Sequence, residues 1–496
     1  MRSVLPVFAS LILVAFAGGA SAESRQAAGS RAITFAPCRL EHPNRVAGVA
    51  AECGSLTVLE NPANAAGRKI QLRVARVPAV SKRKAADPLF VIAGGPGMAA
   101  TAFYPGVAPV FGRINRDRDI VLIDQRGTGG SNALSCELDE EVLFRATDET
   151  VAAETKRCMD SLASRADLKL YTTSIAVGDL DQVREALGYE QINLYGVSYG
   201  TRVTQHYVRR FPERSRAVIL DGVVSPQQIL GPAIALDAEK ALASILQRCA
   251  ADAACAAKFG DPVVTYRELL AQLRAHPVVV TLPNPTTGVS HRMEFGELHL
   301  GTVLRLASYA TEQAALLPLS LHLAKAQDNF TPLAAQFLMV SRSYDEQVAF
   351  GMHNSVVCAD DIPYIKNESV DRPALERSYM GASQLDGLRQ ICALWPRGPV
   401  DADFHAPLKS DVPALLLSGS SDPVTPPEYA RQAQKGFSHS VHVIMEGFGH
   451  GQLGAPCVDR LMSRVIQRGS VDQLDVSCTR LGKPMPFFTT LAGPAP

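Results

Sequence analysis

The chain has 496 residues, which at roughly 100–200 residues per domain is enough for two or three domains or for one large domain with an insertion. Apolar residues make up 47% and charged residues 20%, a balance that excludes disorder and low-complexity fibres and provides for a large core. The 49 basic and 49 acidic side chains cancel, so the chain lacks the basic surface that nucleic-acid binding requires, and nucleic acid is not an expected partner.

Residues 1–22 have the features of a signal peptide. Arg2 gives a positive start, the apolar run Val4–Ala17 follows, and Ala20–Ala22 is a small-residue cleavage site. The run is shorter than a bilayer span requires and ends in polar residues, so an uncleaved membrane anchor is the less favoured alternative. We expect the mature chain to begin near Glu23 and to be exported, periplasmic or secreted, with no stable membrane anchor.

Ten cysteines all lie in the expected mature chain. An even number of cysteines in an exported protein favours disulfides over free thiols or a cysteine nucleophile. The sequence has no Cys-x-x-Cys pair and no histidine cluster near a cysteine, so a metal site is not expected. The simplest arrangement pairs nearest neighbours, namely Cys38 with Cys53, Cys136 with Cys158, Cys249 with Cys255, Cys358 with Cys392, and Cys457 with Cys478.

Short apolar runs that end at polar or glycine-containing turns follow one another along the chain. Two strands are predicted first, at Ser55–Glu60 and Lys69–Pro78. The continuous apolar runs after them are typical of strands that are buried on both faces of a parallel sheet. These runs are Leu89–Ala93, Ile120–Ile123, Ile192–Tyr195, Ala217–Leu220, Ala414–Leu417 and Val441–Met445.

Helices are predicted between several of these strands. Ser174–Leu187 has an amphipathic pattern and ends before Gly188, and Tyr199–Phe211 follows a strand directly and ends before Pro212. Alternation of strands and helices predicts an α/β fold with a mainly parallel central sheet flanked by helices.

The alternation stops between about residue 225 and residue 406, where the pattern is mostly helical. A crossover between parallel strands needs only about a dozen residues or more, so we expect an inserted helical cap. The predicted organisation is a signal peptide at 1–22, the first part of the core at 23–224, the cap at 225–406 and the C-terminal part of the core at 407–496. A separate C-terminal domain starting near residue 410 is disfavoured, because the later strands are needed to complete the sheet. Helices are predicted in the cap at Ala233–Cys249, Tyr266–Leu273, Leu298–Tyr309, Glu312–Asp328 and Leu333–Ser343.

The segment Gly196-Val197-Ser198-Tyr199-Gly200 has the Gly-x-Ser-x-Gly form of a nucleophile elbow. A predicted strand precedes it and a predicted helix follows, so Ser198 is expected at a sharp turn, as a nucleophile. The small residues on either side let neighbouring backbone pass close by, and the helix N-terminus offers N–H groups to a developing oxyanion. The context disfavours the alternative of a serine in an ordinary turn.

Asp422 and His450 follow the last two predicted strands. The order Ser, then Asp or Glu, then His is that of the α/β-hydrolase triad, and both side chains would lie at the carboxyl edge of the parallel sheet. His442 is expected to be an ordinary strand side chain. Asp221, at the end of its own strand, remains the alternative acid.

The turn Gly94–Gly97 follows an apolar strand and can supply a second oxyanion donor besides the N–H of Tyr199. Gly95 is the first choice for this donor, against the alternative of a glycine-rich turn without a ligand. No Gly-Lys-Ser/Thr sequence follows, so a phosphate-binding loop is not expected. Nothing in the sequence calls for a cofactor or a metal.

Three motifs together resemble the proline iminopeptidase-like serine peptidases of the α/β-hydrolase superfamily. They are Ala93–Gly97, Asp124–Ser131 and Gly196–Gly200. The exported tripeptidyl aminopeptidase-like proteins are the more similar branch, and the resemblance covers nearly all of the chain from Cys38 to about Cys478. Such enzymes often carry a loop-orienting histidine where this chain has Ala93, so the support of that loop departs from the family. Further similarity lies at Cys53–Val58, Cys358–Asp360, Cys392–Pro396 and around Asp422 and His450.

The resemblance implies that the protein releases short N-terminal units from peptides through an acyl-enzyme. Ser198 would attack the scissile carbonyl, His450 would transfer the proton, and Asp422 would orient the imidazole. Gly95 and Tyr199 would bind the oxyanion. An exported carboxylesterase or lipase with the same triad is the alternative. A binding protein on an inactive hydrolase fold is disfavoured, because all three triad residues are present in order.

An aminopeptidase needs a carboxylate to bind the free α-amine of its peptide substrate. The expected cap offers Glu294, Glu297, Asp360 and Asp361, against the alternative that each is a surface group. Asp360 is the first choice, because the disulfide expected at Cys358 would hold its segment, and Glu294 is the second.

Overall fold

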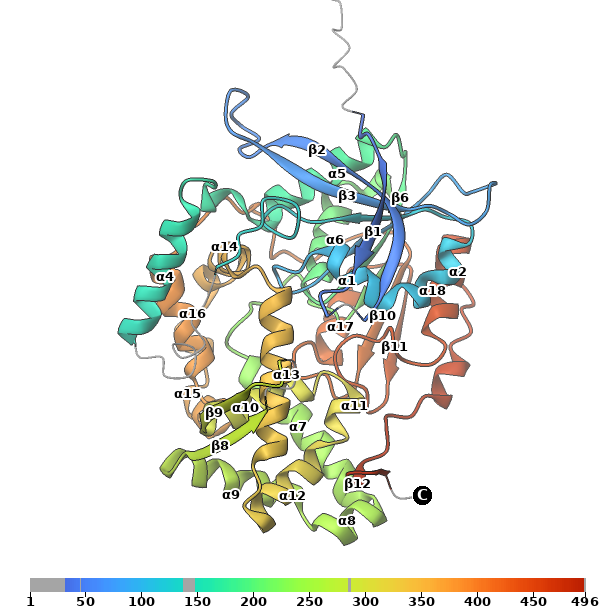
Figure 1. Cartoon of the computed structure of the whole chain (residues 1–496). Coiled ribbons are helices and arrows are strands. Elements are labelled where there is room, and N and C mark those ends of the chain that lie inside the picture. The colour runs from blue at the N-terminus through green and yellow to red at the C-terminus, as the bar shows by residue number, and fades with distance from the viewer. Residues whose placement is uncertain (1–31, 45, 137–147, 284–286, 495–496) are drawn as a thin grey trace, which may run out of the picture. The chain divides into compact units, whose positions relative to one another are not determined.

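The computed structural model describes residues 32–44, 46–136, 148–283 and 287–494 (Figure 1). The expected signal peptide at 1–22 lies outside these residues. In the described part of the chain, no helix combines the length and the apolar character that crossing a membrane requires.

Among the described residues, nine strands form one sheet in the order β1-β2-β3-β5-β4-β6-β7-β10-β11. The first three strands are antiparallel and β3 pairs antiparallel with β5, whereas every neighbouring pair from β5 to β11 is parallel. The predicted mainly parallel sheet is therefore confirmed. The strands are β1 (Ala36–Glu41), β2 (Gly48–Leu59), β3 (Lys69–Val77), β4 (Leu89–Ile92), β5 (Ile120–Ile123), β6 (Ile192–Val197), β7 (Ser215–Asp221), β10 (Ala414–Gly419) and β11 (Ser440–Met445), with a separate pair β12 (Phe488–Thr490) and β13 (Gly493–Pro494).

Helices cover both faces of the sheet. Alternate residues of β4 divide between two buried apolar clusters, with Leu89 and Val91 in one and Phe90 and Ile92 in the other. Helices α1, α2 and α18 pack in the first cluster, and α4, α5, α6 and α17 pack in the second. Burial on both faces explains the continuous apolar runs of the sequence. These helices are α1 (Ala100–Val107), α2 (Gly112–Asn115), α4 (Asp148–Leu162), α5 (Thr173–Ala186), α6 (Tyr199–Arg210), α17 (Pro427–Gln434) and α18 (Val458–Arg468).

The chain leaves the sheet after β7 and returns at β10, which pairs in parallel with β7. We call residues 222–413 the intervening segment. Much of its apolar surface forms a third buried cluster of its own, separate from the two on the sheet. Its elements are α7 (Ile234–Ala251), α8 (Ala253–Phe259), α9 (Pro262–Ala275), β8 (Val278–Pro283), β9 (Ser290–Phe295), α10 (Glu297–Ala307), α11 (Thr311–Ala314), α12 (Leu317–Gln327), α13 (Thr331–Gln347), α14 (Phe350–Asp360), α15 (Arg372–Arg377) and α16 (Ser383–Leu394).

The intervening segment differs from the sequence prediction in several places, and α8, α14, α15 and α16 were not among the predicted helices. The pair β8–β9 was not predicted. Val280 and Leu282 are buried while their neighbours are exposed, which is the alternation of a half-buried strand. The helix predicted at Glu312–Asp328 is divided into α11 and α12, and Pro318 lies in the first turn of α12, where a missing N–H costs nothing.

Five disulfides join the ten cysteines in the nearest-neighbour pattern that the sequence predicts, and none of the cysteines that the structure describes is free. The Cys358–Cys392 bond connects α14 to α16. The pairs close short loops, so each one restrains local structure rather than joining distant parts of the chain.

Arg126, in the motif Asp124–Ser131, is fully buried. Its guanidinium donates to both oxygens of Asp179, at 2.6 and 2.8 Å, and to the carbonyl of Leu170 at 2.8 Å. A buried ion pair is tolerated when its hydrogen bonds are satisfied in this way. This part of the family motif therefore holds β5 and its loop in place.

Candidate active site

Ser198 lies at the turn between β6 and α6 with φ 56° and ψ −125°, a conformation that non-glycine residues seldom adopt. A Cβ on Gly196 would lie 2.3 Å from the Gly200 carbonyl oxygen, and a Cβ on Gly200 would lie 2.4 Å from the Ile92 oxygen. Both contacts are too short for any side chain. The elbow can form only with glycine at these two positions, as the sequence predicts.

Asp422 lies in the loop after β10 and is almost fully buried. Its Oδ1 accepts hydrogen bonds from the backbone N–H groups of Val424 and Thr425, each at 2.8 Å. Its Oδ2 accepts from the Thr425 hydroxyl at 2.8 Å and from His450 Nδ1 at 2.8 Å. The carboxylate is therefore fixed by its own loop in a position that fixes the imidazole in turn.

His450 is held from both sides. Its backbone N–H donates to the Tyr309 carbonyl at 2.8 Å, and the Tyr309 ring meets the imidazole edge-on with centroids 5.1 Å apart. Tyr309 belongs to the intervening segment, just after α10. Ser198 and His450 line the same cavity, of about 480 Å³, which we call the central cavity.

The pKa of His450 is set by opposing effects. Burial acts to lower the pKa of the imidazole, but the charge and hydrogen bond of Asp422, together with the charge of Asp221, outweigh it and raise the pKa above its usual value. Asp221 accepts instead from the Gln452 N–H at 2.8 Å and from the Tyr195 hydroxyl at 2.8 Å, and burial raises its pKa to about 6. Of the two candidate acids, Asp422 is therefore the one hydrogen-bonded to the imidazole.

Gly95, Ser198 and Tyr199 line a second, small cavity of about 50 Å³ beside the central one. Tyr199 is the first residue of α6, and the first N–H groups of a helix have no acceptor within it. The Tyr199 hydroxyl is anchored against the Thr173 hydroxyl at 2.6 Å. Both predicted oxyanion donors thus come from backbone that borders the same space as Ser198.

The oxyanion loop is supported from the intervening segment. The Ala349 N–H donates to the Gly97 carbonyl at 3.0 Å, and His353 Nδ1 donates to the Pro96 carbonyl at 3.3 Å. Ala93, where the family often carries a histidine, is buried. His353, on α14, contacts this loop, and no sequence motif predicted that contact.

Two carboxylates line the small cavity next to Ser198. Asp361 is paired with Arg202 through contacts of 2.9 and 3.0 Å. Asp237, on α7, accepts a short hydrogen bond from the Tyr429 hydroxyl, and burial raises its pKa while that bond opposes the rise. Asp361 was a sequence candidate, whereas Asp237 was not. Nothing in the sequence of α7 distinguishes Asp237, because Glu239 and Lys240 follow it closely on the same helix.

The two preferred amine-binding candidates lie elsewhere. Asp360 is completely buried at the end of α14 and is not among the residues that line either cavity at Ser198. Burial raises its pKa to about 7, the charge of Asp361 adds to the rise and that of Arg202 opposes it. Glu294 is exposed on β9, opposite Val279, and lines neither cavity. Within the described ranges, no cluster of three or more His, Cys, Asp or Glu side chains is placed to hold a metal ion.

Comparison with known proteins agrees with the fold. A family model described as the alpha/beta hydrolase fold matches residues 87–253, which include the oxyanion loop and the elbow. A second model, described as TAP-like protein, matches residues 377–478, which include Asp422 and His450. The chain is a serine hydrolase of the α/β-hydrolase fold.

Three relatives are similar to this hydrolase over most of its sequence. Serine protease Hip1 of Mycobacterium tuberculosis (strain H37Rv) is 26% identical over 489 residues, covering 90% of this chain and 91% of the relative. Tripeptidyl aminopeptidase of Streptomyces lividans is 26% identical over 468 residues, covering 88% and 85%. Carboxylesterase B of M. tuberculosis (strain CDC 1551) is 27% identical over 466 residues, covering 86% of each. The likeness therefore spans both the core and the intervening segment.

The raised pKa of His450 can be tested directly. In protein with ¹³C-labelled histidine, with the resonance assigned from a His450→Gln variant, NMR titration should give a pKa above 6.5. Asp422→Asn removes the charge and the hydrogen bond that favour the imidazolium, so the pKa should fall. Asp221→Asn removes only a longer-range charge and should lower the pKa less. A larger effect at Asp221 would make Asp221 the partner of the imidazole.

Proposed function

We propose that this hydrolase is an exported serine aminopeptidase that releases short N-terminal units from peptides through an acyl-enzyme. The observation that supports this proposal most directly is the acidic lining beside the serine. Asp237 and Asp361 border the small cavity next to Ser198; Asp361 is paired with the buried Arg202, whereas the cation 3.6 Å from Asp237 is the mostly exposed Lys240. An ammonium group needs such a partner when it leaves water.

In the proposed mechanism, the Ser198 hydroxyl attacks the scissile carbonyl while His450 Nε2 takes its proton. Asp422 holds the Nδ1–H tautomer and stabilises the imidazolium that forms. The imidazolium then gives its proton to the leaving amine, and water deacylates the enzyme by the same route. The backbone N–H groups of Gly95 and Tyr199 bind the oxyanion in both steps.

The size of the small cavity favours a short N-terminal unit. It measures about 50 Å³, and a single water needs at least about 10–15 Å³ of such space. This is room for an amino group with a small side chain. We therefore place the free α-amine near Asp237, with the remainder of the peptide in the central cavity.

An exported carboxylesterase is the second candidate. It would use the same Ser198, His450 and Asp422, and a carboxylesterase is among the relatives that the chain resembles over most of its length. The two functions differ in the need for a free amine. A carboxylate pair beside the serine is of no use to a neutral ester, which is why we favour the peptidase.

The function is tested with chromogenic amides of one, two and three residues, each with a free or an acetylated N-terminus, beside short-chain esters. The wild-type protein should cleave free-amine amides and reject acetylated ones. Ser198→Ala should lower kcat by about a millionfold, and His450→Ala should be nearly as damaging, because the two residues act as a unit. A fluorophosphonate should label Ser198 alone. Equal cleavage of acetylated amides, or cleavage of esters only, would contradict the aminopeptidase.

Amine recognition is tested by Asp237→Asn. This change removes a charged hydrogen bond to the substrate amine, which contributes about 1.5–3 kcal/mol to binding. KM for free-amine substrates should therefore rise by about 10- to 100-fold. Activity on acetylated substrates should not fall, so the preference for a free amine should shrink. Glu294→Gln is the matched control, because the Glu294 side chain is exposed on β9 and lines neither cavity at Ser198. This change should leave KM unchanged. If Glu294→Gln has the larger effect, the amine lies elsewhere.

The proposed function includes export of the protein from the cytoplasm. The signal-peptide features of residues 1–22 and the five disulfides support it, since disulfides persist in oxidising compartments. N-terminal sequencing of protein purified from the native host should begin near Glu23. Thiol titration without reductant should find no free cysteine. Several free thiols, or an intact N-terminus in the cytoplasm, would refute export.

A further inference from the structure

The oxyanion loop, which comprises residues 94–97, has no polar side chain of its own. It consists of three glycines and Pro96, and it follows the apolar Ala93. Glycine restricts the backbone less than any other residue, so a loop of this composition loses much conformational freedom when it is fixed. The orientation of the peptide groups around Gly95 therefore depends on contacts with other parts of the chain.

The oxyanion loop packs against the nucleophile elbow. A Cβ on Gly94 would lie 2.9 Å from Ser198 Cβ, so the backbone of the loop lies directly against the serine. The Met98 N–H donates to the Gly94 carbonyl at 3.2 Å, which closes the loop as a turn. These contacts place the loop next to Ser198, and they involve neither the Pro96 carbonyl nor the Gly97 carbonyl.

The intervening segment bonds the loop through the junction between α13 and α14, which we define as residues 348–353. The Ala349 N–H donates to the Gly97 carbonyl at 3.0 Å. Val348 forms an isolated antiparallel bridge with Met98, the residue after the loop. Gly97 has φ 110°, and a Cβ on it would lie 2.9 Å from the Ala349 carbonyl oxygen. The two backbones therefore touch, which requires glycine at this position of the loop.

His353 supplies the side-chain contact to the loop. Its Nδ1 lies 3.3 Å from the Pro96 carbonyl oxygen, and a carbonyl only accepts, so the hydrogen bond requires the proton on Nδ1. Burial lowers the pKa of the imidazole against the opposing effects of the bond to Pro96 and the charge of Asp361. The charge of Arg305 adds to the lowering. His353 is therefore neutral at neutral pH, and its one N–H is committed to the loop.

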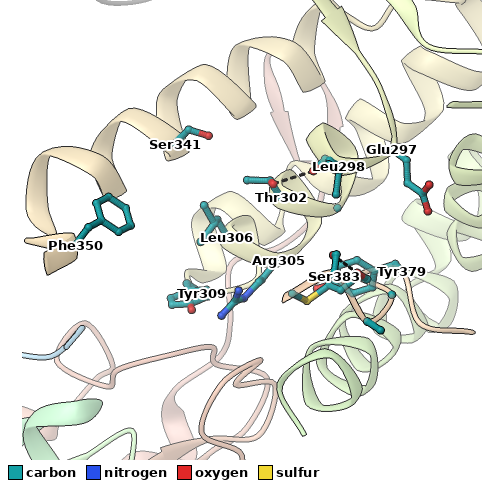
Figure 2. A pocket seen from close by; sticks show the side chains of 14 residues that line it. Glu297, Leu298, Thr302, Arg305, Leu306, Tyr309, Ser341, Phe350, Tyr379 and Ser383 are labelled. Atoms are coloured by element: carbon teal, nitrogen blue, oxygen red, sulfur yellow. Dashed lines mark hydrogen bonds between the residues drawn. The ribbon is translucent and has the colours of Figure 1, made fainter. Parts of the chain in front are cut away.

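The junction is buried between two cavities. Figure 2 shows Phe350 where the chain passes from α13 into α14, and Phe350 lines the cavity that α10 and residues 379–383 also border. Val348, which is 5% exposed, and His353 instead line the central cavity together with Ser198. A buried junction at the meeting point of two helices is a firm support for a loop that cannot support itself.

We propose that His353 is a positioning residue for the oxyanion hole, because it holds the loop so that the Gly95 N–H is directed at the developing oxyanion. The hydrogen bond through Nδ1 acts on the transition state rather than on substrate binding, since the oxyanion forms only when Ser198 attacks. A side chain of α14 thereby makes the loop contact that Ala93 cannot make. This inference rests on the proposed acyl-enzyme mechanism and holds for a peptide or an ester substrate.

The test compares three variants that differ in where they place a hydrogen-bond donor. His353→Leu removes the donor, His353→Asn keeps an amide N–H near the position of Nδ1, and His353→Gln moves it towards the position of Nε2. With phenyl acetate as substrate, His353→Leu should lower kcat by about 10- to 100-fold, somewhat less than removal of an oxyanion donor itself, and leave KM unchanged. His353→Asn should recover most of the loss, and His353→Gln should not.

Binding of phenylboronic acid gives a second measurement that does not depend on turnover. The boronate forms a tetrahedral adduct with Ser198, so its affinity reports the oxyanion hole and should fall in His353→Leu by the same factor as kcat. His322→Leu is the matched control, because it removes another imidazole of the intervening segment, which packs on Phe259 and lines none of the cavities described above. It should leave kcat and the boronate affinity unchanged.

Three results would overturn the role of His353. They are an unchanged kcat and boronate affinity in His353→Leu, a rise in KM alone, and recovery by His353→Gln as complete as that by His353→Asn. Circular dichroism and the recovery in His353→Asn exclude misfolding as the cause of a loss. Failure of the mechanism itself is recognised separately, because wild-type protein would then not be labelled at Ser198 by a fluorophosphonate. Hydrolysis of phenyl acetate without cleavage of any peptide would remove only the aminopeptidase.

Discussion

The parallel register of β7, β10 and β11 is the constraint on which the site depends. Leu417 of β10 lies opposite Asp221 on one side and opposite Val443 on the other, so the three strands reach the same edge of the sheet together. The residues that follow them, Asp422 and His450, therefore meet there although the intervening segment separates β10 from β7 by almost two hundred positions. Backbone pairing, rather than any contact between the side chains themselves, brings acid and base within reach of the elbow.

The intervening segment contacts the loops and the helix that surround Ser198 and His450. Tyr309 supports the loop of His450, His353 supports the oxyanion loop, and Asp361 reaches the helix of the elbow through Arg202. Each of these contacts restrains one loop or helix that carries a candidate catalytic residue. The intervening segment therefore supports the loops that carry the candidate catalytic residues.

The sequence predicted the features that local motifs and strand order determine. It did not predict in which direction a given side chain points from its helix or strand. The elbow, the loops of Asp422 and His450 and the disulfide pairs all follow from motifs or spacing. Asp360 is the last residue of α14 and Asp361 follows it in a non-helical conformation, so the two neighbouring carboxylates point in different directions and only Asp361 lines the small cavity. Glu294 shares this difficulty on β9, where alternate residues face opposite ways. Asp237 was missed because it lies beside Ser198 only in the folded chain, where α7 borders the small cavity.

The Cys358–Cys392 bond has a mechanical consequence for the two helices that it joins. Helix α14 carries His353 and ends beside Asp361, and α16 carries Gln384, the partner of Arg305. Because a covalent bond joins the two helices, with their Cα atoms 5.0 Å apart at that point, they cannot separate there. A displacement of α14 at that point therefore displaces α16 with it, so the helix that contacts the Pro96 carbonyl through His353 and the helix that contacts Arg305 through Gln384 are mechanically coupled.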